Sequence, residues 1–93
     1  MTRNPLKNML SRLIHDPKVN REDYELTYVS RGHVEDRETI NCSSLVRVTH
    51  DYLIFRTQDG NLKSIPFHRV ISLVDKRRGK TLYFNPRLNA ARP

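Results

Sequence analysis

Apolar residues in the first part of the chain recur with the spacing of one face of an α-helix. Asn4-Pro5 is typical of a helix start, because proline loses nothing at the first helical position. Asp16-Pro17 indicates the helix end, because a residue before proline disfavours the α conformation. The sequence therefore predicts a helix over residues 5–15 that packs its apolar face on a sheet. That face consists of Leu6, Met9, Leu10, Leu13 and Ile14.

The rest of the chain shows the alternation and the β-branched and aromatic composition of short strands. The pairs Asp59-Gly60 and Arg78-Gly79 are typical of hairpin tips. One helix followed by a run of strands predicts an α+β fold, with the helix packed on a twisted antiparallel sheet or partly closed barrel of about five strands. The predicted strands cover residues 24–30, 52–57, 62–65, 70–75 and 80–84, with a shorter one over 39–41, a turn over 42–44, and a segment at 46–48 too short to assign.

With 93 residues the chain is expected to form one small domain, with an ordered core over about 4–86 and a tail over 87–93. No apolar run approaches the ~20 residues that a membrane span needs. The N-terminus lacks the apolar segment of a secretory signal, and the single cysteine, Cys42, has no partner for an internal disulfide. We therefore expect a cytoplasmic protein without membrane association.

Positive charge is concentrated in the last third of the sequence. The net charge is +7; residues 1–60 hold nine Lys and Arg against nine Asp and Glu, whereas residues 61–93 hold eight against one. A basic surface gains affinity for nucleic acid by displacing counterions from phosphates. Charge for solubility alone is the alternative. Three of these cations, Arg77, Arg78 and Lys80, are expected at one hairpin tip.

Residues 65–74 combine a strand signal with two side chains that can bind phosphate, His68 and Arg69. Pro66 suits a strand start or a bulge, because it lacks an N–H. The pleat is therefore predicted to begin near Phe67, which places the two side chains on opposite faces unless a break at Pro66 turns both to one rim. The alternative is that His68 bonds a backbone carbonyl and Arg69 is a solvated charge.

Catalytic and metal-binding signatures are weak. The four histidines show no i, i+3 or i, i+4 pair, and one cysteine without a Cys/His cluster argues against zinc. Cys42-Ser43-Ser44 lacks the signature of an activated nucleophile. Two-histidine phosphodiesterases, which open cyclic phosphates, repeat a His-x-Ser/Thr motif, and neither His68-Arg69-Val70 nor His50-Asp51-Tyr52 carries the hydroxyl residue. We therefore expect no metal, no cofactor and a binding protein rather than an enzyme.

Binding chemistry is better represented. An arginine grips a phosphate with two hydrogen bonds, a histidine donates one or two, and a tyrosine ring can stack on a base. Arg31, His68, Arg69 and Tyr28 supply these groups. An aromatic residue with strand periodicity, such as Tyr28, more often belongs to the core.

Taken together, these motifs resemble a small archaeal domain, the RNA cyclic group end recognition domain. The resemblance covers Pro5 to about Phe84. It is carried by a helix ending in Asp-Pro, the segment Tyr24-x-x-x-Tyr28-Val29-x-Arg31-Gly32 with Asp36 after it, the segment Ile65-Pro66-Phe67-His68-Arg69-Val70-Ile71, and a glycine and tyrosine around the final strand.

The resemblance implies a module that recognises RNA ends, with 2′,3′-cyclic phosphate termini as the expected ligand, in RNA processing or repair. It implies phosphate contacts by His68, Arg69 and Arg31, with support from Gly32, Asp36 and Pro66. Members commonly read His-Arg-Gly where this chain has Ser30-Arg31-Gly32, so one histidine is missing unless His33 replaces it. The alternatives are a phosphodiesterase acting on cyclic ends and a protein-interaction subunit of an RNA-processing complex.

Overall fold

The computed structural model describes residues 5–30 and 37–85. The predicted helix is present as α1, Pro5–His15. Its leucines Leu6, Leu10 and Leu13 are buried and point into the core, as the periodicity predicts. Asp16 follows the last helical residue and caps it, since its N–H donates to the Arg12 carbonyl at 2.9 Å. Within the described segments, no helix is long and apolar enough to cross a membrane.

Four strands form one antiparallel sheet in the order β2-β1-β6-β7. Its central strands β1 and β6 pair along most of their length, from Tyr24 opposite Asp75 to Tyr28 opposite Val70. Gly79, with φ of 64°, forms the tip between β6 and β7, where a left-handed backbone favours glycine. The strands are β1 (Tyr24–Val29), β2 (Arg37–Asn41), β6 (Val70–Asp75) and β7 (Lys80–Phe84).

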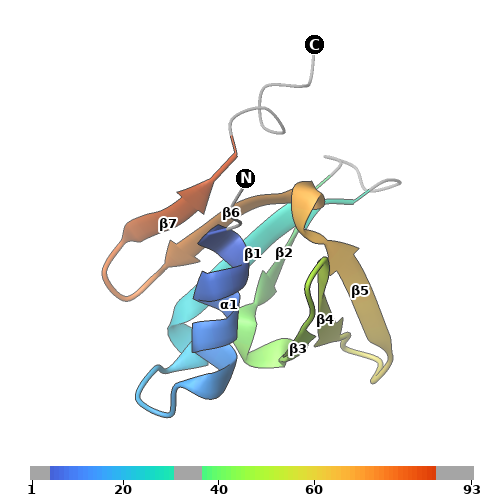
Figure 1. Cartoon of the computed structure of the whole chain (residues 1–93), viewed down its shortest axis with the longest axis horizontal. Coiled ribbons are helices and arrows are strands. Elements are labelled where there is room, and N and C mark those ends of the chain that lie inside the picture. The colour runs from blue at the N-terminus through green and yellow to red at the C-terminus, as the bar shows by residue number, and fades with distance from the viewer. Residues whose placement is uncertain (1–4, 31–36, 86–93) are drawn as a thin grey trace.

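Three further strands form a second antiparallel sheet in the order β3-β4-β5. Figure 1 shows this three-stranded sheet beside the four-stranded one, with α1 in front of the latter. Gly60, with φ of 89°, lies in the turn between β4 and β5, where a hairpin is predicted. The strands are β3 (Leu45–Val48), β4 (Tyr52–Arg56) and β5 (Leu62–Pro66).

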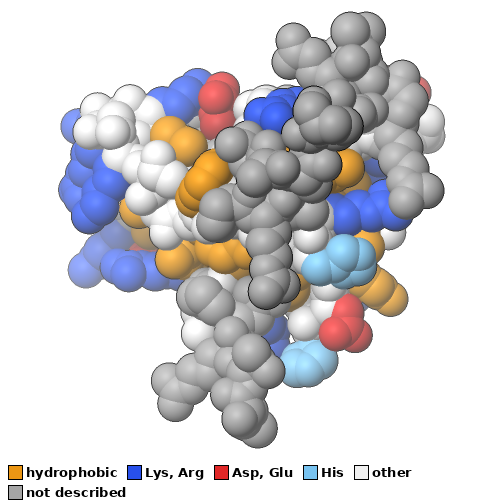
Figure 2. Space-filling view, turned by 90° about the horizontal axis from the view of Figure 1, so that it is seen from above, with side chains coloured by type: hydrophobic (Ala, Val, Ile, Leu, Met, Phe, Trp, Pro, Cys, Tyr) orange, Lys and Arg blue, Asp and Glu red, His pale blue; other side chains and the backbone are white. Residues whose placement is uncertain are grey.

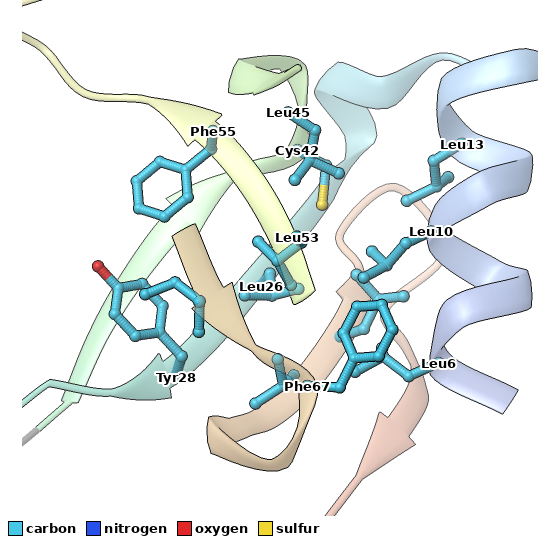
Figure 3. Close-up of a cluster of buried hydrophobic side chains, with 13 residues drawn as sticks. Leu6, Leu10, Leu13, Leu26, Tyr28, Cys42, Leu45, Leu53, Phe55 and Phe67 are labelled. Carbon is cyan, nitrogen blue, oxygen red and sulfur yellow. The ribbon is translucent and has the colours of Figure 1, made fainter. Parts of the chain in front are cut away.

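The chain passes between the sheets through two single turns of 3-10 helix. One, η2 (Cys42–Ser44), leads from β2 to β3, and the other, η3 (Phe67–Arg69), leads from β5 to β6. A third, η1 (Arg21–Asp23), precedes β1. The core lies between the two sheets and the helix; Figure 3 shows the leucines of α1 directed toward Leu26, Leu53 and Phe67, with Tyr28 and Phe55 on the far side.

The structure confirms the α+β class and the antiparallel pairing, and it corrects three details. The strands form two sheets of four and three rather than one sheet of about five, and the described segments contain no closed barrel. The segment 46–48, left unassigned, belongs to β3, and β2 begins at Arg37 rather than at residue 39. The pleat begins at Val70 rather than near Phe67, because residues 67–69 form η3.

Candidate nucleic-acid interface

The turn η3 is held in place by both sheets. On one side, Pro66 pairs with Tyr52 across β5 and β4, and the Phe67 N–H donates to the Asp51 carbonyl at 3.1 Å. On the other side, Val70 pairs with Tyr28 of β1. Phe67 itself is buried in the core. These contacts anchor the backbone of the turn at both ends.

His68 and Arg69, the two central residues of the predicted site, lie on this turn. His68 is exposed and Arg69 is half-buried. Neither side chain has a hydrogen bond or an ion pair to another described residue. The alternative in which His68 bonds a backbone carbonyl is therefore not what the described residues show. Because η3 replaces the predicted strand, strict alternation no longer separates the two side chains to opposite faces.

Arg31, Gly32 and Asp36 lie outside the described residues. The chain is described up to Ser30, one residue beyond the end of β1. Because β1 and β6 run antiparallel with Tyr28 opposite Val70, the end of β1 lies beside η3. The topology thus brings the segment that leads into Arg31 next to the turn that carries His68 and Arg69.

Tyr28 is a core residue, which is the alternative that its strand periodicity favours. Its side chain is 1% exposed, and its hydroxyl donates to the Glu38 carboxylate. Burial, together with this acceptor and its charge, raises the pKa of the phenol far above the ordinary value. The Lys63 ammonium lies 5.5 Å from the ring centroid. The ring therefore has no open face for a base.

A polar cleft of about 440 Å³ opens between the two sheets where Tyr28 lies. An ion pair of 3.8 Å between Lys63 of β5 and Glu38 of β2 joins its two sides. Other polar residues also line it. These are Thr39, Asn41, Ser44, Arg56, Thr57 and Gln58.

The basic hairpin between β6 and β7 is as exposed as predicted, but most of its cations lie near acids. Lys76 pairs with Glu25 at 3.1 Å, Arg77 lies 3.9 Å from Asp23, and Arg78 lies 4.0 Å from Asp75. Lys80, the remaining cation, is exposed and has no ion pair to a described residue. Figure 2 shows the cluster of Lys and Arg side chains at one edge of the molecule. The acids come from β1, η1 and β6, so folding offsets part of the charge that the sequence concentrates here.

Sequence reasoning missed the turn that faces η3. Residues 49–51 join β3 to β4 and include His50, and Tyr52 begins β4; His50 and Tyr52 are both exposed. Asp51 is the acid of this turn. The available signal was the alternation in β4, where buried Leu53 and Phe55 place Tyr52 on the opposite, outward face.

Neither the thiol of Cys42 nor a cluster of metal-binding side chains is poised for chemistry in the described part of the chain. Cys42 is fully buried, and this burial, with the nearby Glu25 carboxylate, raises the pKa of its thiol to about 12, so the thiol stays protonated at neutral pH. No group of three or more His, Cys, Asp or Glu side chains is placed to hold a metal ion among residues 5–30 and 37–85.

Two antiparallel sheets, one packed helix and a basic surface with an exposed His-Arg turn define a small, basic α+β domain. The chain belongs to the MJ1316 RNA cyclic group end recognition domain family, whose model matches residues 3–84. It is 31% identical over 78 residues to a UPF0248 protein of Methanococcus maripaludis, covering 84% of this chain and 95% of that protein.

Two further relatives come from other archaea. The chain is 31% identical over 78 residues to a UPF0248 protein of Methanocaldococcus jannaschii, covering 84% of this chain and 90% of that protein. It is 31% identical over 77 residues to a UPF0248 protein of Pyrococcus furiosus, covering 82% of this chain and 83% of that protein. No solved structure matches the chain.

Proposed function

We propose that this protein is an RNA-binding module that recognises RNA ends carrying a 2′,3′-cyclic phosphate. The observation that carries the proposal is η3, which both sheets hold and which presents His68 and Arg69 without a partner among the described residues. The description of the family, RNA cyclic group end recognition, supports the same ligand.

In this proposal the Arg69 guanidinium binds the terminal phosphate with two hydrogen bonds and His68 donates a further one. Arg31 joins them from the segment that follows β1. Asp36 orients one of the cations without touching the phosphate, while Gly32 and Pro66 shape the backbone. Exposed Arg77, Arg78 and Lys80 contact the RNA backbone at a distance from the end and add little sequence preference.

Charge alone does not select the cyclic end. A cyclic phosphate carries one negative charge, whereas an open 2′- or 3′-monophosphate carries close to two. A cationic site therefore favours the open end unless its donors fit the ring. An anchored turn is suited to such a fit, because its backbone does not have to be ordered when the ligand binds.

The test compares one short RNA with three ends: cyclic phosphate, 3′-phosphate and 3′-hydroxyl. We expect the wild-type protein to bind the cyclic end most tightly. A charged, bidentate contact contributes about 1.5–3 kcal/mol, so Arg69→Ala should lower affinity for the cyclic end roughly 10- to 100-fold. His68→Ala should act in the same direction. Neither variant should change affinity for the 3′-hydroxyl end by more than about twofold.

Lys18→Ala is the matched control, because it removes one exposed charge after α1, at the opposite end of the helix from η3 (Figure 1). Equal affinity for all three ends contradicts end recognition and leaves a general RNA binder. Opening of the cyclic phosphate by the wild type, abolished in His68→Ala, identifies a phosphodiesterase instead. No affinity for any RNA at low salt favours the protein-interaction module.

A further inference from the structure

The outward face of the three-stranded sheet carries side chains that the described residues leave exposed. Along β4, Leu53 and Phe55 point into the core, so Tyr52, Ile54 and Arg56 point outward. Their partners on β5 share this face, and the antiparallel register sets Tyr52 beside Pro66 and Arg56 beside Leu62. Tyr52 is 43% exposed and Leu62 58%. An aromatic residue is therefore partly open to solvent on this face of the sheet.

The charged residues in the strands of this sheet are all positive. Strands β3, β4 and β5 contain the cations Arg47, Arg56 and Lys63 and no acidic residue. Arg47 is exposed and has no hydrogen bond or ion pair to another described residue. Arg56 bonds only a neutral group, the Gly60 carbonyl, at 3.2 Å. The acids nearest in sequence, Asp51 and Asp59, lie in the turns at either end of β4.

This face continues directly into η3. Tyr52 pairs with Pro66, which precedes η3, and Asp51, next to Tyr52, accepts the hydrogen bond from the Phe67 N–H. Two paired residues on adjacent strands lie about 5 Å apart between their Cα atoms. His68 is two residues beyond Pro66. A nucleotide whose phosphate contacts η3 is therefore within reach of the Tyr52 ring.

We propose that this sheet face binds the single-stranded RNA that ends at η3, with Tyr52 stacking on the base of the last nucleotide and Arg47 and Arg56 contacting phosphates further from the end. The proposal rests on the function proposed above. Exposed aromatic rings stack on any base, and cations beside them follow the backbone, so such a surface binds single strands with little sequence preference.

The cleft between the sheets is the less suitable place for the base. Its interior contains the buried ring of Tyr28, and its sides are joined by the ion pair between Lys63 and Glu38. A base entering there has to break contacts that hold the two sheets together. The outward face of β4 needs no such rearrangement.

The test couples a change in the protein to a change in the RNA. The RNA ends in uridine or in dihydrouridine, whose saturated ring is not planar and stacks poorly. Losing one stacked base costs about 1–3 kcal/mol, so Tyr52→Ala should weaken binding of the uridine RNA roughly 5- to 100-fold. Tyr52→Val provides the same test with a residue of high strand propensity. Tyr52→Phe should bind as the wild type does, because the ring remains.

The dihydrouridine RNA should bind the wild type as weakly as the uridine RNA binds Tyr52→Ala, with no further loss when both changes are combined. Phe84→Ala is the control, since Phe84 is a 49% exposed aromatic residue on β7 of the other sheet. The proposal would be overturned if the losses of RNA affinity from Tyr52→Ala and from dihydrouridine simply added. It would also be overturned if Phe84→Ala lowered the affinity as much as Tyr52→Ala does.

Running the same series on 3′-hydroxyl ends separates this proposal from end recognition. If the cyclic and hydroxyl ends bind equally, end recognition fails, while coupling between Tyr52 and the last base still supports stacking. If the cyclic end is preferred but Tyr52 and the last base are not coupled, end recognition holds and the sheet face is not the RNA surface.

Discussion

Among the described residues, most cations of the β6–β7 hairpin lie beside carboxylates, whereas most cations of the three-stranded sheet do not. Lys76, Arg77 and Arg78 each lie within 4.0 Å of an acid. On the three-stranded sheet only Lys63 has such a partner among the described residues, and Arg47 and Arg56 do not. The exposed ion pairs themselves contribute little to stability. Their consequence is electrostatic, because an acid close to a cation reduces the attraction that a phosphate experiences there.

The comparison shows that charge counted along a sequence differs from charge on the folded surface. The last 33 residues hold the entire excess of positive charge, yet Asp23 and Glu25 reach the hairpin from the first third of the chain. The three-stranded sheet, drawn from residues 45–66, has fewer cations but none of its strands carries an acid. Each cation of the sheet is therefore expected to attract an RNA phosphate more strongly than each cation of the hairpin does.

Reversing charge on the sheet should have the largest effect. The double variant Arg47→Glu, Arg56→Glu is expected to weaken binding of a single-stranded RNA on the order of 30-fold at 0.1 M salt. Because two phosphate contacts disappear, the slope of log affinity against log salt should fall by about 1.4. Both quantities come from binding titrations at several salt concentrations. An unchanged slope contradicts phosphate contact by these arginines.

Reversing charge at the hairpin should reduce RNA affinity less than reversing charge on the sheet, although it changes more residues. The triple variant Arg77→Glu, Arg78→Glu, Lys80→Glu is expected to weaken all RNAs alike, roughly five- to tenfold at 0.1 M salt, since these cations contact backbone and two are partly offset by acids. Competition between RNAs of different sequence and end measures this uniformity. A loss greater than that of the double variant on the sheet reverses the comparison.

Removing the acids at the hairpin tests the same idea with the opposite sign. The double variant Asp23→Asn, Glu25→Gln releases Arg77 and Lys76, and we expect RNA affinity to rise about two- to threefold at low salt. The rise should vanish above about 0.5 M salt, where such charges are screened. Glu22→Gln is the control, because Glu22 is an exposed acid of the same turn as Asp23 and has no ion pair to another described residue. An equal rise in the control means that only net charge matters.

Local signals in the sequence are sufficient to predict the helix and most of the strands. Contacts between residues far apart in the sequence decide how the strands are grouped into sheets. Proline at position 5 and Asp16-Pro17 bound the helix by backbone sterics alone, and Gly60 and Gly79 lie where positive φ is needed. The division into two sheets depends on η2 and η3, whose place is set by pairing between strands far apart in sequence. The 3-10 turn at residues 67–69 leaves no periodic pattern, so it was interpreted as the start of a strand.

At the candidate site, the sequence likewise does not show which of two tyrosines, Tyr28 and Tyr52, is buried. Tyr28 and Tyr52 both alternate with apolar or polar neighbours in a strand, and alternation does not tell which face is inside. The structure buries Tyr28 against Phe55, with ring centroids 5.9 Å apart, and leaves Tyr52 half-exposed beside η3. The sequence thus indicates His68 and Arg69 as a candidate site. It suggests Tyr28 of β1 as the aromatic residue of this site, whereas the solvent-exposed tyrosine beside η3 is Tyr52 of β4.

The smallest expected effect concerns Asp59, the acid of the β4–β5 turn. Its carboxylate accepts hydrogen bonds from the Thr57 hydroxyl and, at 3.2 Å, from the Asn61 amide. The bond from Thr57 is the main reason that the pKa of Asp59 lies below its ordinary value of 3.8, and a backbone hydrogen bond adds to it. These partners are neutral, and Arg56 bonds the Gly60 carbonyl rather than this carboxylate. Asp59 therefore supports the turn without pairing to the arginine of the sheet.

A lowered pKa means that the ionised carboxylate stabilises the folded state. This contribution is fully present above the unfolded pKa and is lost as the pH falls through the lower, folded pKa. Thermal unfolding of the wild type and Asp59→Asn should therefore differ slightly at neutral pH, and the difference should disappear as the pH falls below the lowered pKa of Asp59 in the folded state. RNA affinity of Asp59→Asn at neutral pH should rise by less than that of Asp23→Asn, Glu25→Gln. A larger rise would show that Asp59 does offset Arg56, and the contrast between sheet and hairpin would then be weaker than the geometry indicates.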